Sequence, residues 1–342
     1  MNFRSGLPMA AGLFCVLSTS FAQAADAALI EAAKKDGSVT WYTTQIVNQI
    51  AAPIADAFEK KYGVKVNYVR ADNNEVILRL NSEAKAGKVQ GDVFDGTVAT
   101  SLIRDGLVLQ WQPDSVKAMP KDYQDPQGYW VATNLYVHTP GINTALVPKG
   151  QEPKTHQDFL DPKWKGKMVW AARQASSAAP GFIGSVFADM GEEKGKAFLR
   201  ELAKQNVAAL GVSARQVLDQ VIAGEYSIAL NIFNNHATIS AEQGAPSAWL
   251  PINPGLAVFS IAAITKNGPH QNAAKLLLDY LVSEEGQKIY SAANYISVHP
   301  NVPPKDPSLR PDGAKFKAIF VQPDEVEAKV AEWWKVYQEI FR

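Results

Sequence analysis

The chain has 342 residues, with 34 basic and 34 acidic side chains, five histidines and one cysteine. This length allows one or two globular domains, and the 20% charged fraction argues against disorder. A chain with zero formal net charge lacks the basic surface that binding to a phosphate polyanion requires, so the composition removes the general case for a nucleic-acid-binding protein.

Residues 1–24 are predicted to be a secretory signal that is removed. Arg4 precedes an apolar run over 7–17, which is too short to span a membrane, and 22–24 form a small-x-small cleavage site. Lipoprotein processing at Cys15 is the alternative, but it would place the cleavage inside the apolar run. The mature chain would then lack cysteine, which excludes disulfides and thiolate metal sites. We therefore expect a periplasmic protein.

Strands and helices alternate in the first third of the mature chain. Strands are predicted at 39–44, 64–69 and 92–94 from their β-branched and aromatic residues. Helices are predicted after each strand, at 46–62, 74–86 and 98–105, because apolar residues recur there at helical spacing. This βαβαβα order favours a mainly parallel sheet covered by helices on both faces.

The remaining two thirds continue the alternation with longer loops. Residues 176–181 form a small-residue loop that is expected to enter a helix near Phe182. The other predicted segments are an extended stretch at 129–138, strands at 167–171, 226–232 and 256–264, and helices at 192–205, 213–222, 269–283 and 324–341.

Motifs for catalysis are missing from the sequence. It contains no dinucleotide-binding G-x-G-x-x-G, no P-loop, no G-x-S-x-G and no H-E-x-x-H. The five histidines are scattered without the spacing of metal ligands: His138, His156, His236, His270 and His299. We therefore predict a protein that is not an enzyme and that uses no cofactor and no resident metal.

Polar residues gather where two of the predicted strands end. Thr43, Thr44 and Gln45 follow the first strand, and Asp95, Gly96 and Thr97 follow the third, so these residues are expected to bind the ligand. In open α/β sheets ligands bind at the carboxyl ends of strands, where helix N-termini offer free N–H groups to an anion. The alternative is that the two threonines only cap the next helix.

The sequence resembles a known family at this point. The segments 41–45 and 57–66 resemble the opening of periplasmic solute-binding proteins of ABC importers. Further landmarks follow in the family's order over nearly the whole mature chain, at 92–94, 106–107, 162–167, 223–225 and 284–287. The branch most resembled is that of the ferric-ion-binding proteins and their relatives for phosphonates and sugar phosphates.

The resemblance implies a type 2 periplasmic binding fold, an α/β architecture of two lobes. Each lobe would hold a mixed, mainly parallel sheet flanked by helices, and two strands would form the hinge. The expected boundaries are 25–130 with 258–305 for lobe 1, 131–257 for lobe 2, and 306–342 for a helical tail packed on the lobes. The implied partners are a small-molecule ligand and an inner-membrane permease with its ATPase, and we expect a monomer.

The sequence departs from the ferric-binding pattern at the metal ligands. Asn235 precedes His236 and Ala237, where that pattern carries a tyrosine pair. Thr97 stands where it often carries an acid, although Asp95 is near. Neutral ligands suit a hard ferric ion poorly, so the sequence favours a small, polar, probably anionic organic solute. A ferric ion with a synergistic anion is the alternative, and a secreted hydrolase is a third possibility.

The resemblance also carries over cleft residues from the second lobe. Arg173 and Arg215 lie in segments that face the cleft in the family, and a guanidinium can grip a carboxylate or phosphonate through two parallel hydrogen bonds. A surface position on an amphipathic helix is the alternative for Arg215. The other expected ligand-binding residues of this half are Tyr136 as an aromatic wall, Ser176 and Ser177 as hydroxyl donors, and Asn231, Asn234 and His236 after a strand that enters the cleft.

Overall fold

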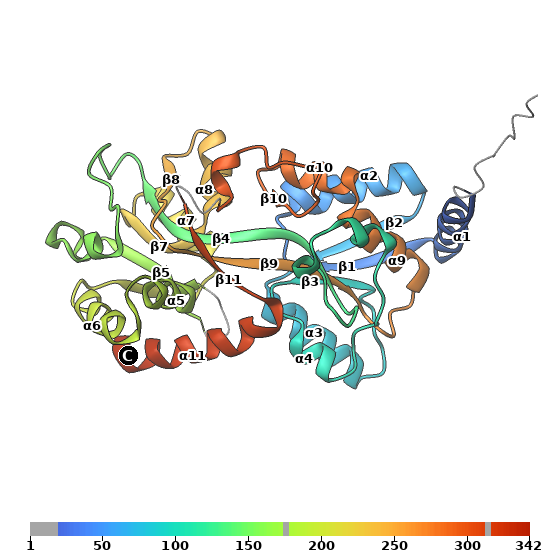
Figure 1. The fold of residues 1–342 in the computed structure, drawn as a ribbon, viewed down its shortest axis with the longest axis horizontal. Coiled ribbons are helices and arrows are strands. Elements are labelled where there is room, and N and C mark those ends of the chain that lie inside the picture. Colours follow the sequence, from blue (N-terminus) through green and yellow to red (C-terminus); the bar gives the residue numbers. More distant parts are fainter. Residues whose placement is uncertain (1–19, 174–177, 312–315) are drawn as a thin grey trace, which may run out of the picture.

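Two halves joined by two long strands make up the molecule, as the computed structural model shows for residues 20–173, 178–311 and 316–342 (Figure 1). The joining strands are β4 (Val131–Asn143) and β9 (Gly255–Ile264), which pair antiparallel along most of their length. Every residue of both strands is buried. The predicted two-lobed α/β architecture with a two-strand connection is therefore present.

Lobe 1 is built on three parallel strands. β1 (Ser38–Thr43) pairs with β2 (Lys65–Arg70) on one side and with β3 (Val93–Gly96) on the other. β3 then pairs antiparallel with the last residues of β9, which attaches this sheet to the connecting strands. The carboxyl ends of β1 and β2 consequently meet at one edge, beside the other lobe.

Helices α2 (Ala52–Tyr62), α3 (Asn73–Lys85) and α4 (Thr100–Arg104) connect these strands. The helix predicted from Ile46 onward begins instead as a π-helical segment, Val47–Ala51, which leads into α2. The helix predicted at 98–105 is reduced to the single short α4. Ile54 and Phe58 of α2 are buried, in accord with their helical spacing.

Lobe 2 repeats the scheme with a second set of parallel strands. β5 (Met168–Ala171) lies between β6 (Ala208–Leu210) and β7 (Ile228–Phe233), and β7 and β8 (Ser247–Trp249) pair antiparallel with β4. The helices of this lobe are α5 (Ala178–Met190), α6 (Glu192–Ala203), α7 (Ala214–Ala223) and α8 (Asn234–Glu242). Helix α5 thus begins before Phe182, inside the predicted loop.

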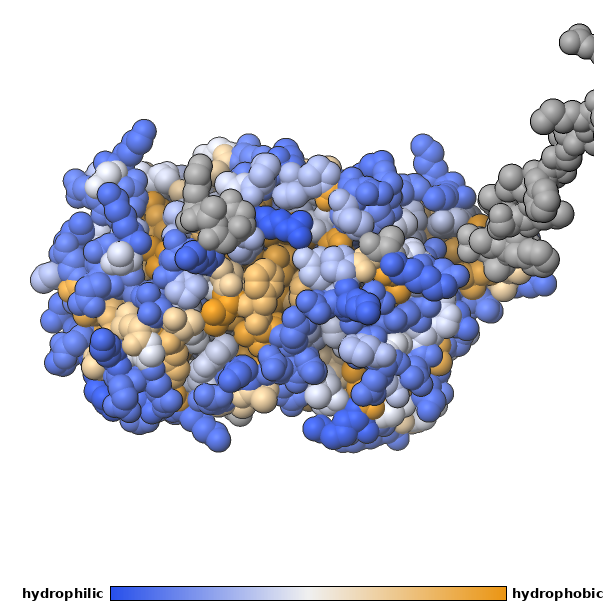
Figure 2. All heavy atoms as spheres, in the orientation of Figure 1, coloured by the Kyte–Doolittle hydropathy of each residue, from blue (hydrophilic) through white to orange (hydrophobic). Residues whose placement is uncertain are grey.

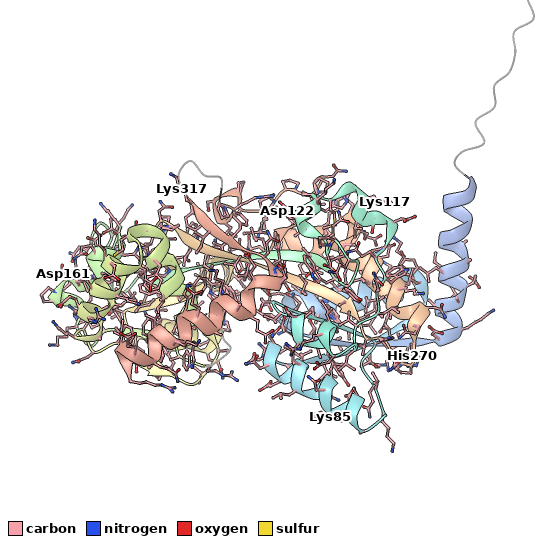
Figure 3. The ribbon with its side chains drawn as sticks, turned by 60° about the horizontal axis from the view of Figure 1, so that its bottom comes forward. Lys85, Lys117, Asp122, Asp161, His270 and Lys317 are labelled. Carbon is pink, nitrogen blue, oxygen red and sulfur yellow. The ribbon has the colours of Figure 1, made fainter. Side chains whose placement is uncertain are left out.

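The chain returns to lobe 1 after β9 and then crosses back. Helices α9 (Gln271–Val282) and α10 (Glu284–Ala292) and the short strand β10 (Ile296–Ser297) complete lobe 1. Strand β11 (Ala318–Val321) pairs with β9, and α11 (Pro323–Phe341) runs from beside α3 and α4 toward α6 (Figures 1 and 3). The predicted residue boundaries of the lobes stay a prediction.

Helix α11 is docked on lobe 2 by aromatic packing. The Trp170 ring of β5 lies 5.5 Å from the Tyr337 ring and 4.7 Å from the Phe341 ring, centroid to centroid. Gly184 of α5 leaves room for the indole of Trp333, since a Cβ atom at Gly184 would lie 2.4 Å from that ring. The C-terminal helix is therefore fixed to lobe 2 although it begins beside lobe 1.

The described helices and the surface of the molecule bear on whether a segment of the chain spans a membrane. Within 20–173, 178–311 and 316–342, no helix is both long and apolar enough to cross a bilayer. Helix α1 (Ser20–Asp36) runs across the predicted cleavage site, and the signal stays a prediction. Figure 2 shows mostly polar surface over both lobes and an apolar area near the middle of the same face.

Candidate functional site

A cavity between the two lobes is the candidate binding site, and we call it the interlobe cavity. Lobe 1 lines it with the ends of β1 and β2 and the first turn of α3, and lobe 2 lines it with the start of α7 and residues of β7 and α8. Its volume is about 150 Å³, and it meets a wider mouth of about 840 Å³ that shares four charged residues with it, namely Arg70, Asp72, Arg173 and Arg215.

Three guanidinium groups face this cavity from different elements. Arg70 ends β2, Arg173 follows β5, and Arg215 lies in the first turn of α7. Arg173 and Arg215 were predicted from the sequence as site residues, but Arg70 was not. The signal was available, because Arg70 occupies the carboxyl end of a strand adjacent to the one that ends at Thr43.

One carboxylate lies between two of the arginines and links the lobes. Asp72 Oδ1 is 3.1 Å from a terminal nitrogen of Arg70, and Asp72 Oδ2 accepts a hydrogen bond of 3.1 Å from Arg173. Arg215 instead pairs with Asp219 on its own helix at 2.6 Å and donates to Ser240 Oγ at 3.0 Å. Asp72 and Arg173 therefore form an ion pair across the cleft.

Two helix N-termini from opposite lobes point at the same space. Asp72 is the N-cap of α3, with Asn73 and Asn74 in its first turn, and Ser213 is the N-cap of α7. Both caps belong to capping boxes, which fix where each helix starts. The positive ends of two helix dipoles thus add to the charge of the arginines.

The floor of the cavity is aromatic and neutral. The Tyr136 ring stacks on Phe233 with centroids 4.3 Å apart, and the His138 and His236 rings lie 4.4 and 5.1 Å from Phe233. Burial lowers the pKa of His138 to about 4, although the hydrogen bond between its Nδ1 and the acceptor Oδ1 of Asn231 acts in the opposite direction. Burial first, and then the charge of Arg215, lowers the pKa of His236 to about 3.

His236 is the polar group of the floor with unused hydrogen-bonding capacity. It is only 6% exposed, and neither ring nitrogen has a hydrogen-bond partner among the described residues. A buried polar group without a partner is costly unless something occupies the space beside it. Since His236 lines the interlobe cavity, a bound solute is a natural partner for it.

Two of the predicted site residues, Thr43 and Asp95, lie behind the cavity wall. Thr43 Oγ1 and Thr44 Oγ1 both donate to the carboxylate of Asp95, and Thr44 N donates to Asp95 Oδ1 at 2.8 Å. Asp95 is 1% exposed, and burial raises its pKa despite these donors. Asp95 therefore anchors the loop that follows β1 through hydrogen bonds to Thr43 and Thr44. Of the two threonines, only Thr44 lines the cavity.

Gln45 connects that loop to the two strands that join the lobes. Its Nε2 donates to Asn134 Oδ1 of β4 at 3.2 Å and to Ser260 Oγ of β9 at 3.1 Å. The Tyr136 hydroxyl donates to Gln45 Oε1 at 3.1 Å. Gln45 is fully buried, so its contacts tie lobe 1 to the hinge rather than to the cavity.

Gly96 and Thr97 are held against the first turn of α3. Asn73 Oδ1 accepts from Thr97 N at 2.9 Å, and a Cβ atom at Gly96 would lie 1.9 Å from the same oxygen. Glycine at 96 is thus required for the close approach of Asn73. Thr97 lines the interlobe cavity, whereas Gly96 shapes its wall.

The predicted asparagines of lobe 2 are buried in contacts of their own. Asn231 Oδ1 bonds to His138 Nδ1 at 2.8 Å, and Asn234 Nδ2 donates to the carbonyl of Leu309 at 2.8 Å. Asn234 therefore fastens the segment before β11 to α8. The remaining predicted residues, Ser176 and Ser177, lie outside the described residues.

A second polar cluster bears on the hydrolase alternative. His156 Nδ1 lies 2.9 Å from Asp189 Oδ2, and His156 Nε2 lies 3.2 Å from Ser185 Oγ, in the connectivity of a serine hydrolase triad. However, Ser185 is 6% exposed and its hydroxyl donates to the carbonyl of Pro254. These three side chains tie α5 to the segment before β9, and none of them lines the interlobe cavity.

The fold and its polar interlobe cavity define the class of solute-binding proteins with the type 2 periplasmic binding fold. Among solved structures, iron-bound HitA from Pseudomonas aeruginosa superposes with a TM-score of 0.72 and 21% identity, covering 89% of this chain and 99% of that one. AfuA from Actinobacillus pleuropneumoniae, with exogenous fructose-6-phosphate bound, gives a TM-score of 0.76 and 20% identity, with 89% and 98% covered. The predicted fold class is confirmed.

The chain belongs to the family of bacterial extracellular solute-binding proteins, which it matches over residues 89–320, more than half of its length. A curated relative, the Fe(3+)-binding periplasmic protein of Serratia marcescens, is 23% identical over 277 residues, which are 77% of this chain and 79% of the relative. The predicted membership in the periplasmic binding proteins of ABC importers is confirmed.

Proposed function

We propose that this protein captures a small organic anion, a carboxylate, phosphonate or phosphate, in the interlobe cavity. It carries the solute, as a monomer, to an inner-membrane permease whose ATPase drives uptake. No bond of the solute is made or broken.

The observation that carries the proposal is the charge of the cavity lining. Three arginines and one aspartate are the charged residues of that lining, and the N-termini of α3 and α7 add two positive dipole ends. The histidines of the floor are neutral at pH 7 because burial lowers their pKa. An anion that displaces Asp72 from Arg70 and Arg173 therefore finds fixed donors from both lobes.

Donors from both lobes give the solute a means to stabilise the closed form. Arg70 and Thr44 belong to lobe 1, whereas Arg215 and His236 belong to lobe 2. A solute that contacts all four interacts with both lobes only when they are close together. Such a ligand shifts the open and closed populations by its difference in affinity for the two forms.

Ferric iron is the second candidate, and the names of relatives support it. The Serratia relative is called an Fe(3+)-binding protein, and HitA was crystallised with iron. The donor chemistry of this chain favours the organic anion, since a trivalent cation would be repelled by three guanidiniums. Among the described residues, no group of three or more His, Cys, Asp and Glu side chains is placed to hold a metal ion.

Isothermal titration with a panel of organic acids, phosphonates, phosphate esters and ferric citrate tests the proposal. Arg70→Ala and Arg215→Ala should each weaken the best anion by about 10- to 150-fold, which corresponds to the loss of a charge-assisted hydrogen bond of about 1.5–3 kcal/mol. Arg104→Ala is the matched control, because Arg104 is an exposed arginine of lobe 1.

Two results would contradict the proposal. Equal affinities for wild type, Arg70→Ala and Arg215→Ala would show that the anion binds elsewhere. Stoichiometric iron in the purified protein, with a charge-transfer absorption band in visible light, would favour the ferric alternative.

A further inference from the structure

A second cavity borders the interlobe cavity, and we call it the side chamber. It lies between α3 and the start of α4 on one side and α11 on the other, with a volume of about 450 Å³. Figures 1 and 3 show α11 passing beside these two helices on its way to lobe 2. The side chamber therefore has one wall from lobe 1 and one wall that is fixed to lobe 2.

The two cavities share a wall. Asn73, Asn74 and Thr97 line both of them. Asn73 is held by its hydrogen bond to Thr97 N, whereas the side chain of Asn74 has no hydrogen-bond partner among the residues the structure describes. The Asn74 side chain can thus turn aside without breaking a hydrogen bond to a described residue.

The lining of the side chamber differs in character from that of the interlobe cavity. Ile77 and Val98 come from lobe 1, and Val326, Val330 and Trp334 come from α11. These side chains are apolar, and the chamber's charged residues, Glu327 and Lys335, are exposed on α11. The other polar residues of the lining are Ser101 and Gln338, beside the shared Asn73, Asn74 and Thr97. The interlobe cavity by contrast has three arginines, so a cationic cavity borders one with apolar side chains on both walls.

We propose that the side chamber accepts an apolar portion of the solute whose anionic group sits in the interlobe cavity. This inference rests on the proposed function and narrows its ligand class to an anion that carries an alkyl or aryl group. Burial of apolar surface supplies affinity in proportion to area, and such a group would touch Ile77 on lobe 1 and Trp334 on the helix docked to lobe 2. It would thereby favour the closed form together with the anionic head.

A homologous ligand series tests this directly by isothermal titration of the full mature chain. The probes are methyl, butyl and hexyl phosphate, together with the matching carboxylates acetate, pentanoate and heptanoate. Each methylene that enters the chamber should tighten binding by about 3- to 4-fold, so hexyl phosphate should bind at least about tenfold more tightly than methyl phosphate.

Filling the chamber should remove that gain without touching the anionic head. Ala331 lines the side chamber and is exposed, so Ala331→Phe places a ring in it. Val98→Phe does the same from the wall of lobe 1. Both variants should bind methyl phosphate like wild type and hexyl phosphate no better than methyl phosphate. Ala328→Phe, at an exposed position of α11 outside the chamber, is the matched control and should keep the chain-length effect.

The outcomes separate the two proposals. If methyl phosphate or acetate binds and the affinity is flat along both series, the side chamber takes no part of the ligand and this inference is wrong, while the anion site stands. If the gain persists in Ala331→Phe and Val98→Phe, the alkyl group lies elsewhere, which also overturns it. If no member of either series binds, the proposed anion site fails and this inference fails with it.

Discussion

At the scale of single residues, a position at the end of a strand was a better predictor of which residues line the interlobe cavity than the chemical type of the side chain. Thr44, Thr97, Arg173, Arg215 and His236 all line the interlobe cavity, as expected. Thr43 and Gln45 flank Thr44, and Asp95 lies two residues before Thr97, but these three side chains are buried. Adjacent residues of a strand alternate between faces, and the loop geometry after a strand decides which one is exposed, so sequence position alone could not separate them.

The two histidines of the cavity floor should make stability depend on pH. Their pKa values are lowered in the folded protein, to about 4 for His138 and about 3 for His236. Below about pH 6.5 the two histidines are protonated in the unfolded chain but stay neutral in the folded protein. The free energy of unfolding therefore decreases as the pH is lowered. The slope of the unfolding free energy against pH can reach about 2.7 kcal/mol per pH unit when two groups contribute. Asp95 acts in the opposite direction, since its pKa is raised.

Urea unfolding at pH 7 and at pH 5.5 measures this dependence. For His138→Gln and His236→Gln, the free energy of unfolding should change less between the two pH values than it does for wild type. His299→Gln, outside the cavity, is the control. An unchanged slope in both cavity variants would mean that folding does not lower the pKa values of these two histidines.

At the scale of elements, long periodic segments were predicted well and short connections were not. The strands and most helices lie within a few residues of their predicted places. The strands β6, β8, β10 and β11 are four residues long or fewer and were missed, because so few residues cannot display a period. The equally short β3 and β5 were predicted from their β-branched and aromatic residues instead. The π-helical start before α2 was missed for a related reason, since its apolar spacing is close to that of an α-helix.

The docking of α11 on α5 should be sensitive to the size of one side chain. Gly184→Val would place carbon atoms within the ring of Trp333, and overpacking of this kind costs about 1–3 kcal/mol. We expect a lower urea midpoint for this variant. Gly211→Val is the control, because no atom lies within 4 Å of a Cβ built at Gly211. Equal midpoints for the two variants would show that α11 is free to shift on lobe 2.

At the scale of the whole molecule, the contact that the sequence hid most completely is the ion pair across the cleft. Asp72 and Arg173 are 101 residues apart and come from different lobes. Each one is unremarkable in its own segment, as the cap of a helix and as the residue after a strand. Their meeting depends on how far the lobes are closed, which no local pattern records.

Asp72 should act as a competitor of the ligand. Its carboxylate occupies Arg70 and Arg173, the groups an anion would need, and it repels a second negative charge. Asp72→Asn keeps a good N-cap for α3 and removes the charge. We expect it to bind the anionic solute about tenfold more tightly, or about 1.4 kcal/mol, in titrations at low salt.

The control is Asp114→Asn, an exposed aspartate paired with Lys117. Weaker binding by Asp72→Asn would contradict the prediction and would mean that Asp72 orients the two guanidiniums for the ligand.

The pairing of β3 with β9 has a consequence for how the chain is assembled. On one side β3 pairs with β1, but on the other side residues 93–96 pair with residues 261–264, which leave the ribosome much later. Until then the nascent sheet of lobe 1 presents an open edge along β3, and such edges invite pairing with other chains. Strands β5, β6 and β7 of lobe 2, by comparison, follow one another closely and pair among themselves. The sheet of lobe 1 is thus started first but stays incomplete until residues 261–264 are made, and its β3 edge is exposed for that whole interval.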